Sequence, residues 1–120
     1  MRTILIVQKI MTKIKNAHTL GMEAHDYTDF STWIAFWESK KKSWRYLLQS
    51  KQSSSKFKCS KCEEEKEWSE FDGAHVIKVD STDKKKYIYP LCQTCNRGRD
   101  ETPFEGKEVL LLDIPPKKNK

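Results

Sequence analysis

Four cysteines are the residues of this chain whose type and spacing most clearly predict chemistry. Two residues separate Cys59 from Cys62, two separate Cys92 from Cys95, and 29 residues lie between the pairs. Two residues between cysteines let both thiolates of a tight turn face one ion, and two such turns complete a tetrahedron. The spacing therefore predicts one structural Zn²⁺ with all four thiolates as ligands. Two disulfides, or four unrelated thiols, are the alternatives.

Two further motifs lie between or overlap the cysteine pairs. They are Gly73-Ala74-His75-Val76 and the run from Tyr87 to Asn96, which contains the second cysteine pair. Together they resemble the HNH-type ββα-metal finger, in particular a small bacterial and phage subgroup with a GAHV motif between two zinc knuckles. The resemblance covers about residues 57–112, and residues 33–44 resemble the tryptophan-rich segment that precedes the first knuckle in such proteins.

The resemblance implies specific roles for two side chains. His75 would be the general base that activates water, and Asn96 would help to hold a second, catalytic ion, Mg²⁺ or Mn²⁺. Two positions depart from the family pattern: Ala74 stands where an aspartate often binds metal, and Tyr87 stands near the place of a central asparagine. We therefore expect His75 not to be a strong catalytic base. The alternative role for its ring is a hydrogen bond to backbone near the knuckle.

Charge is unevenly distributed along the chain. The formal net charge is +6, and no Asp or Glu interrupts the basic residues between positions 40 and 61, whereas residues 63–72 are mainly acidic. A basic surface suits a polyanion, most often nucleic acid, although many surface lysines also occur on proteins without such a partner. The residues predicted to contact nucleic acid or another partner are Lys40, Lys41, Lys42, Arg45, Arg97 and Arg99. For the last two, ion pairs with the acidic stretch are the alternative.

The start of the chain is briefly apolar but becomes charged at Lys9 and lacks a cleavage site of small residues. No apolar run approaches the length of about 20 residues needed to cross a bilayer. These features predict a cytoplasmic location, where paired cysteines bind metal more often than they form disulfides. The resemblance to the bacterial and phage subgroup implies that the cell is a bacterial or phage-infected host cell.

The N-terminal part is predicted to be helical. Apolar residues of positions 3–17 recur at steps of three and four, which fits an amphipathic helix, although a strand is the alternative. A second helix is expected to begin near Asp29 or Ser31 and to run through Glu38. Trp33, Phe36 and Trp37 share one face of it; they could stack on bases, but a chain poor in aliphatic residues needs them in the core. His18 and His25 have no ligand partners at recognisable spacing.

From residue 57 the pattern predicts short strands and turns. Residues 74–79 and 87–89 are expected to pair as a hairpin, residues 96–100 to open a short helix, and residues 108–112 to form a last strand. The predicted class is α+β, with N-terminal helices packed on a small ββα-metal, HNH-like zinc finger and a treble-clef-like site of four cysteines. The predicted regions are 1–50 (helical), 51–114 (zinc-binding) and 115–120 (basic tail), with residues 49–56 as a polar linker.

Three functions follow from these observations. The first is a zinc-stabilised protein that binds nucleic acid, DNA or RNA, through a degenerate HNH-like fold. The second is an active metal-dependent HNH endonuclease. The third is a phage-type inhibitor that binds a host nucleic-acid-targeting complex such as a CRISPR effector. The oligomeric state is left open by the sequence.

Overall fold

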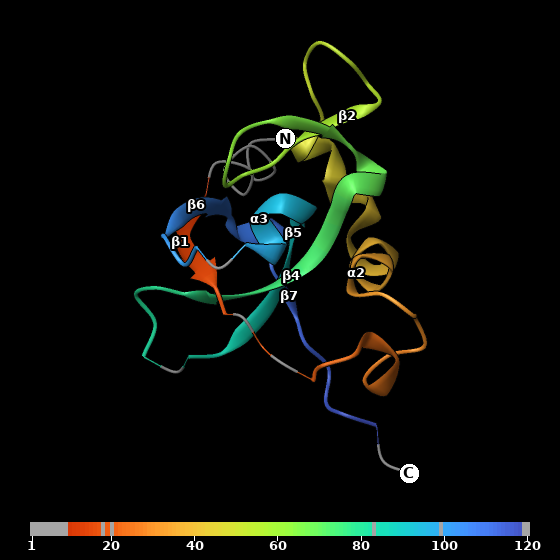
Figure 1. Ribbon diagram of the computed structural model, residues 1–120, viewed down its shortest axis with the longest axis vertical. Coiled ribbons are helices and arrows are strands. Elements are labelled where there is room, and N and C mark those ends of the chain that lie inside the picture. Colours follow the sequence, from red (N-terminus) through yellow and green to blue (C-terminus); the bar gives the residue numbers. More distant parts are fainter. Residues whose placement is uncertain (1–9, 18, 20, 83, 99, 119–120) are drawn as a thin grey trace.

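A five-stranded antiparallel sheet forms the centre of the chain (Figure 1). The computed structural model describes residues 10–17, 19, 21–82, 84–98 and 100–118. The strand order is β6-β1-β4-β5-β7. The strands are β1 (Met11–Asn16), β4 (Phe71–Lys78), β5 (Lys86–Cys92), β6 (Phe104–Lys107) and β7 (Leu112–Asp113). The α+β class is therefore confirmed, whereas the assignment to the ββα-metal fold stays a prediction.

The hairpin of β4 and β5 is the longest pairing in the sheet. Its register runs from Phe71 opposite Cys92 to Ile77 opposite Lys86. The predicted hairpin is thus confirmed, and both strands begin or end beyond the residues expected for them. From Gly73 to Ile77, partly exposed and buried positions of β4 alternate, as expected of a strand whose two faces meet different surroundings.

The helix predicted over residues 3–17 is wrong for its second half, because residues 11–16 form β1; residues 3–9 lie outside the described part of the chain. β1 pairs with β4 on one side and with β6 on the other. These long-range hydrogen bonds decide the conformation of a segment whose apolar spacing fits either element. The predicted helical region 1–50 therefore contributes a strand to the sheet of the predicted zinc-binding region.

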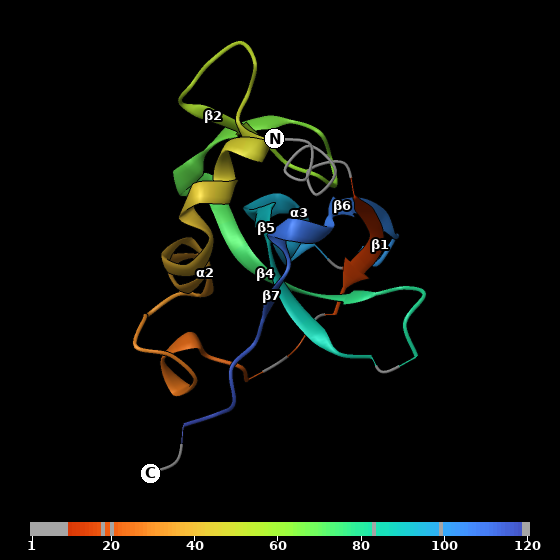
Figure 2. The same cartoon turned by 180° about the vertical axis from the view of Figure 1, so that it is seen from behind.

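Helix α2 (Trp33–Lys41) packs across β4, as Figures 1 and 2 show from opposite sides. Its N-cap is Thr32, whose side chain accepts a hydrogen bond from the Ala35 N–H, so the observed cap lies one residue after the predicted cap Ser31. Trp37 is fully buried and donates its indole N–H to the Leu110 carbonyl at 2.8 Å. Phe36 is also buried, and the predicted core role of these rings is confirmed.

The two faces of the sheet meet different partners. Gly73 lies against the backbone of Trp33 and Ile34 in α2, so odd-numbered residues of β4 point to what we call the α2 face. Even-numbered residues point to the opposite side, the α3 face, where Asp72 contacts helix α3 (Gln93–Arg97). A core of Ile14, Tyr89 and Phe104 also lies on the α3 face, closed over Gly106.

A second, two-stranded sheet carries the first cysteine pair. It consists of β2 (Lys56–Lys58) and β3 (Glu65–Glu67). Two smaller predictions need correction. The short helix lies at Gln93–Arg97 instead of residues 96–100, and residues 108–110 form a 3₁₀ turn before the two-residue strand β7 instead of one strand over 108–112. Leu110 and Leu111 are buried all the same, which explains the apolar run.

Candidate metal centre

The first cysteine pair lies in the turn between β2 and β3. The Glu63 N–H donates to the Cys59 carbonyl at 2.8 Å, and the Cys59 N–H donates to the Glu64 carbonyl at 2.9 Å. These two bonds close the chain into a tight knuckle. Glu63 has a φ of 66°, a left-handed conformation that glycine adopts most readily, so the turn is formed at some cost in backbone strain.

The second pair lies where β5 passes into α3. Cys92 is the last residue of β5 and the N-cap of α3, and Cys95 lies inside the helix. Three residues along a helix bring a side chain back to nearly the same side, so this strand-to-helix junction directs both thiols to one point. The second pair therefore depends on a different local structure from the first.

All four sulfur atoms lie together. Each is within 4.8 Å of every other, and the Sγ atoms of Cys62 and Cys92 are 3.8 Å apart. Zinc–sulfur bonds of about 2.3 Å in a tetrahedron place sulfur atoms about 3.8 Å apart, whereas a disulfide needs about 2.05 Å. The four cysteines are free thiols in this structure and converge on one point, which favours a metal site over two disulfides or four unrelated thiols. They are positioned to bind a metal ion.

The protonation of the thiols depends on their surroundings. Burial acts to raise the pKa of the Cys59 thiol, but hydrogen bonds with the backbone of Cys62, Cys92 and Lys61 outweigh burial and leave that pKa below its ordinary value. Burial raises the pKa of Cys92 and of Cys95. The cluster thus favours the Cys59 thiolate and resists ionisation of Cys92 and Cys95, and a divalent cation would supply the charge that stabilises these thiols as thiolates.

The residues inside the first knuckle attach it to the five-stranded sheet. The hydroxyl of Ser60 lies 2.8 Å from the hydroxyl of Tyr89, which also accepts the Lys107 N–H at 3.0 Å. Lys61 donates to the Asp100 carbonyl at 2.6 Å, and its side chain is only 9% exposed. Hydrogen bonds therefore link the knuckle to β5, through Tyr89 to β6, and to the loop after α3.

His75, the predicted base, lies on the α2 face of β4. Its Nδ1 is hydrogen-bonded to the Thr19 hydroxyl, and its ring centre lies 5.0 Å from that of Trp33 in an edge-on arrangement. Its Nε2 is buried and has no hydrogen-bond partner among the described residues. Burial, and to a smaller extent the charge of Lys86, lowers the pKa of His75 to about 4, so the ring is neutral at pH 7.

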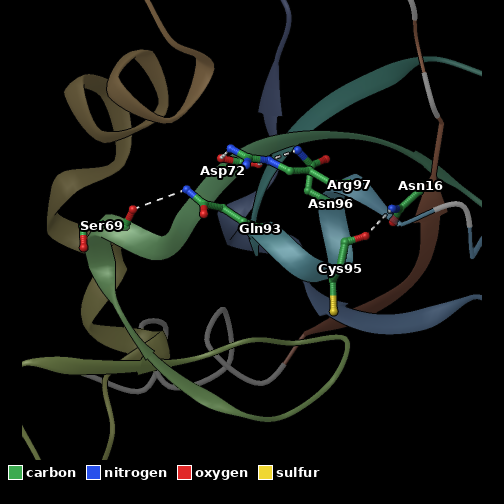
Figure 3. A network of polar contacts seen from close by, with 7 residues as sticks. All are labelled: Asn16, Ser69, Asp72, Gln93, Cys95, Asn96 and Arg97. Carbon is green, nitrogen blue, oxygen red and sulfur yellow. Dashed lines mark hydrogen bonds and ion pairs between the residues drawn. The ribbon is translucent and has the colours of Figure 1, made fainter.

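Asn96, the predicted ligand of a catalytic ion, lies on the α3 face. Its amide donates to the Asp72 carboxylate at 2.9 Å, and the Arg97 guanidinium contacts the same carboxylate at 3.1 Å (Figure 3). The figure also shows Asn16 of β1 donating to the Cys95 carbonyl, at 3.0 Å. This polar network fixes α3 against β1 and β4, and hence positions the second cysteine pair.

His75 and Asn96 are therefore not brought together. Successive residues of a strand point to opposite faces of the sheet. His75 lies on the α2 face of β4, against Trp33, whereas Asn96 lies on the α3 face, against Asp72. Ala74 and Tyr87, the two positions that depart from the HNH pattern, do not connect His75 with Asn96. Ala74 is buried on the α3 face, and Tyr87 on β5 carries Lys78 and Lys85 near its ring, at 5.2 and 5.4 Å.

The sequence reasoning missed Asn16, and it included Asp72 only as part of the acidic stretch and not as the partner of Asn96. The alternation of a strand offered a signal for Asp72, because it must share a face with Ala74 and not with His75. Nothing in the sequence pairs Asn16 with residue 95, since their contact depends on how β1 joins the sheet.

The predicted basic contact residues are largely engaged within the fold. Lys41 donates to the Val109 carbonyl at 3.0 Å, and burial lowers its pKa. Arg45 pairs with Glu38 and lies over the rings of Phe57 and Trp68. Arg97 pairs with Asp72, as the alternative for that residue predicted.

The remaining basic and histidine residues of the predictions differ in exposure. Lys40 and Lys42 are exposed, with Lys40 near the Phe36 ring. Arg99 and His18 lie outside the described residues, whereas His25 is exposed beside Asp26. Within the described residues, no helix has the length and apolar character of a membrane span.

Comparisons with known proteins add no family to this description. No protein-family model, no curated protein and no solved structure matches the chain. The HNH resemblance therefore rests on the motifs at residues 73–76 and 87–96 alone.

Proposed function

We propose that this chain is a nucleic-acid-binding protein whose fold is held by a structural Zn²⁺ ion on Cys59, Cys62, Cys92 and Cys95. Four thiolates complete a tetrahedral site and leave no open position for a substrate or an activated water. The ion would connect the β2–β3 turn to the junction of β5 and α3. Its role is to stabilise the fold that presents a binding surface.

The observation that carries the binding function is a surplus of cations without carboxylate partners. Lysine and arginine number 23 against 17 acidic residues. Several exposed lysines take part in none of the ion pairs found among the described residues. They are Lys13, Lys40, Lys42, Lys51, Lys56 and Lys86. Unpaired surface cations attract a polyanion and release its counterions on binding.

The endonuclease function has weaker support. The imidazole of His75 is neutral and could accept a proton, but no carboxylate contacts it among the described residues, and Asn96 points to the other face of β4. General-base catalysis at a metal requires both groups within reach of one reacting water. We therefore favour nucleic-acid binding over endonuclease activity as the function of this chain.

Fluorescence anisotropy tests the proposal. Labelled single-stranded RNA, single-stranded DNA and duplex DNA are titrated with the wild-type protein from about 50 to about 200 mM salt. Binding that weakens steeply with salt supports the proposal. No binding to any of the three probes at the lowest salt contradicts it and favours a protein partner, such as the nucleic-acid-targeting effector.

A plasmid incubation with Mg²⁺ or Mn²⁺ decides the enzymatic alternative. We expect no nicking above that of a His75→Ala variant, because the predicted base and ligand lie apart. Nicking that disappears in both His75→Ala and Asn96→Ala, while each variant keeps its zinc, would establish the endonuclease in place of the binding protein.

A further inference from the structure

The α2 face of the sheet is covered at one end and open at the other. Helix α2 covers it at Gly73 and His75, through the backbone and ring of Trp33. Beyond His75, β4 continues through Ile77 to Lys78, and the β4–β5 hairpin projects away from α2 (Figures 1 and 2). Lys13 and Lys86 on the neighbouring strands are exposed there.

The register places a row of lysines on this open part. Lys15 of β1 and Lys86 of β5 are both partners of Ile77, one on each side of β4. Cross-strand partners share a face, so both lysines lie with Ile77 on the α2 face. Lys13 lies two residues along β1 and shares the same face. Strands about 4.8 Å apart and a rise of about 3.4 Å per residue put neighbouring lysine Cα atoms about 7 to 10 Å apart.

These three lysines, which we call the lysine row, have no ion pair among the described residues. The one cross-strand carboxylate partner is Glu105 of β6, opposite Lys13, and no ion pair joins them in the described chain. Two other lysines of the same hairpin do form ion pairs, Lys78 with Glu108 and Lys85 with Asp113. The charge of Lys86 also reaches His75, whose pKa it helps to lower.

The contact residues predicted from the sequence are less available. Lys41 is engaged by the Val109 carbonyl, Arg45 by Glu38 and Arg97 by Asp72, which leaves Lys40 and Lys42, at the end of α2, among the predicted contact residues that the structure describes. The lysine row instead joins three charges on rigid strands, with the half-buried Ile77 between two of them.

We propose that the lysine row, Lys13, Lys15 and Lys86, is the surface that contacts the phosphodiester backbone of nucleic acid. This inference rests on the proposed function and gives its location on the molecule. The contacts are to phosphates and are independent of base sequence, because a row of lysines supplies charge without the planar donors that read base edges.

A pair of matched double variants tests the location. Lys15→Gln with Lys86→Gln removes two charges from the row, and Lys40→Gln with Lys42→Gln removes two charges from the end of α2. Each is titrated beside the wild type against single-stranded RNA, single-stranded DNA and duplex DNA. Zinc content and circular dichroism show that both variants stay folded.

We expect the row variant to bind each probe at least about tenfold more weakly near 0.1 M salt, with a salt slope smaller by about 1.4 to 1.8 for two lost contacts. The α2 variant should stay within about threefold of the wild type. Equal losses in the two variants, or a larger loss in the α2 variant, would overturn the location while the proposed function stands. A wild type that binds none of the probes would overturn both.

Discussion

The cysteine cluster and the pair of His75 and Asn96 come from overlapping segments of the chain, yet their side chains are placed very differently. Four sulfur atoms converge to within 4.8 Å of one another. His75 contacts Thr19 and Trp33 on one face of β4, whereas Asn96 contacts Asp72 on the other. Of the two sites that the HNH resemblance implies, the four cysteines come together, whereas His75 and Asn96 do not.

The difference lies in what positions each group. A cysteine pair two residues apart is brought together by a single turn or by one helical step, so local structure suffices. His75 and Asn96 belong to different elements and would meet only if α3 packed on the α2 face of β4. The location of Asp72, on the strand face opposite to that of His75, draws α3 to the opposite side of the sheet.

The largest effect should come from removing a ligand of the cluster. Cys59→Ala or Cys92→Ala should release the metal and unfold at least residues 57–96, because metal binding of about 10 kcal/mol or more is comparable to the whole stability of a small domain. Elemental analysis and circular dichroism measure both. Ser60→Ala, in the same knuckle, is the control and should cost about 1 kcal/mol through its bond to Tyr89. Cysteine variants that remain folded without metal would refute a structural centre.

The next effect concerns the glycine of the GAHV motif. A Cβ at position 73 would lie 2.6 Å from the Trp33 carbonyl carbon and 2.8 Å from the Ile34 nitrogen, both backbone atoms that cannot turn aside. Gly73→Ala should therefore lower the free energy of unfolding by about 3 kcal/mol. In Gly98→Ala the nearest atom is 3.2 Å away, and the cost should be below about 1 kcal/mol. Chemical denaturation that finds the two variants equally stable would mean that α2 does not cover this face.

A smaller effect should appear with pH at His75. The pKa of this histidine is about 4 in the folded chain, below its ordinary value of 6.5. The unfolded chain therefore binds the proton more readily, and the free energy of unfolding should fall as the pH is lowered from about 6.5 to about 4. After allowance for partial exposure, His75 should account for about 2 kcal/mol of this loss.

His75→Asn isolates this contribution, because asparagine keeps a polar atom toward Thr19 and does not titrate. Carboxylates and metal ligands are common to both proteins and cancel in the comparison. The free energies of unfolding of the two proteins, measured by denaturation at several pH values, should differ less at pH 4 than at pH 6.5. A difference that stays constant across that range would show that His75 titrates normally and is not held between Thr19 and Trp33.

The smallest effect should be a gain in stability at the first knuckle. Glu63 has a φ of 66°, so Glu63→Gly should relieve strain and stabilise the fold by up to about 1 kcal/mol, despite the entropy of glycine in the unfolded chain. Glu64→Gly, at the next position without a positive φ, should destabilise. Thermal unfolding compares the two variants. A lower melting temperature in both variants would show that contacts of the Glu63 side chain, and not its backbone conformation, determine the stability of the knuckle.

The sequence predicted the metal cluster, the β4–β5 hairpin and α2 because each depends on near neighbours. Cysteine spacing, the alternation of residues 74–79 and a cap before Trp33 are local signals. For β1 the helix was preferred to the strand alternative since Ile10, Met11 and Ile14 fit a helical step, although residues 13–16 also alternate between exposed or half-buried and buried positions. Pairing with β4 and β6 decides between the two patterns.

The basic surface shows the same limit. A run of cations in sequence does not tell which of them the fold engages, and Lys41 and Arg45 are both drawn into contacts with distant segments or aromatic rings. The lysine row contains only two nearby residues of the sequence, Lys13 and Lys15, and Lys86 joins them through strand register. Such surfaces arise from topology and cannot be read from charge runs.

The most direct test of the account is the metal content of the wild-type protein and its response to chelation. Protein purified without added zinc is analysed for metals, then titrated with a strong chelator while circular dichroism follows the fold. We predict one zinc per chain, with loss of structure in proportion to zinc removed and recovery when zinc is returned. A chain that contains no zinc, or that keeps its structure after zinc is removed, would contradict the claim that the four cysteines form the structural centre of this fold.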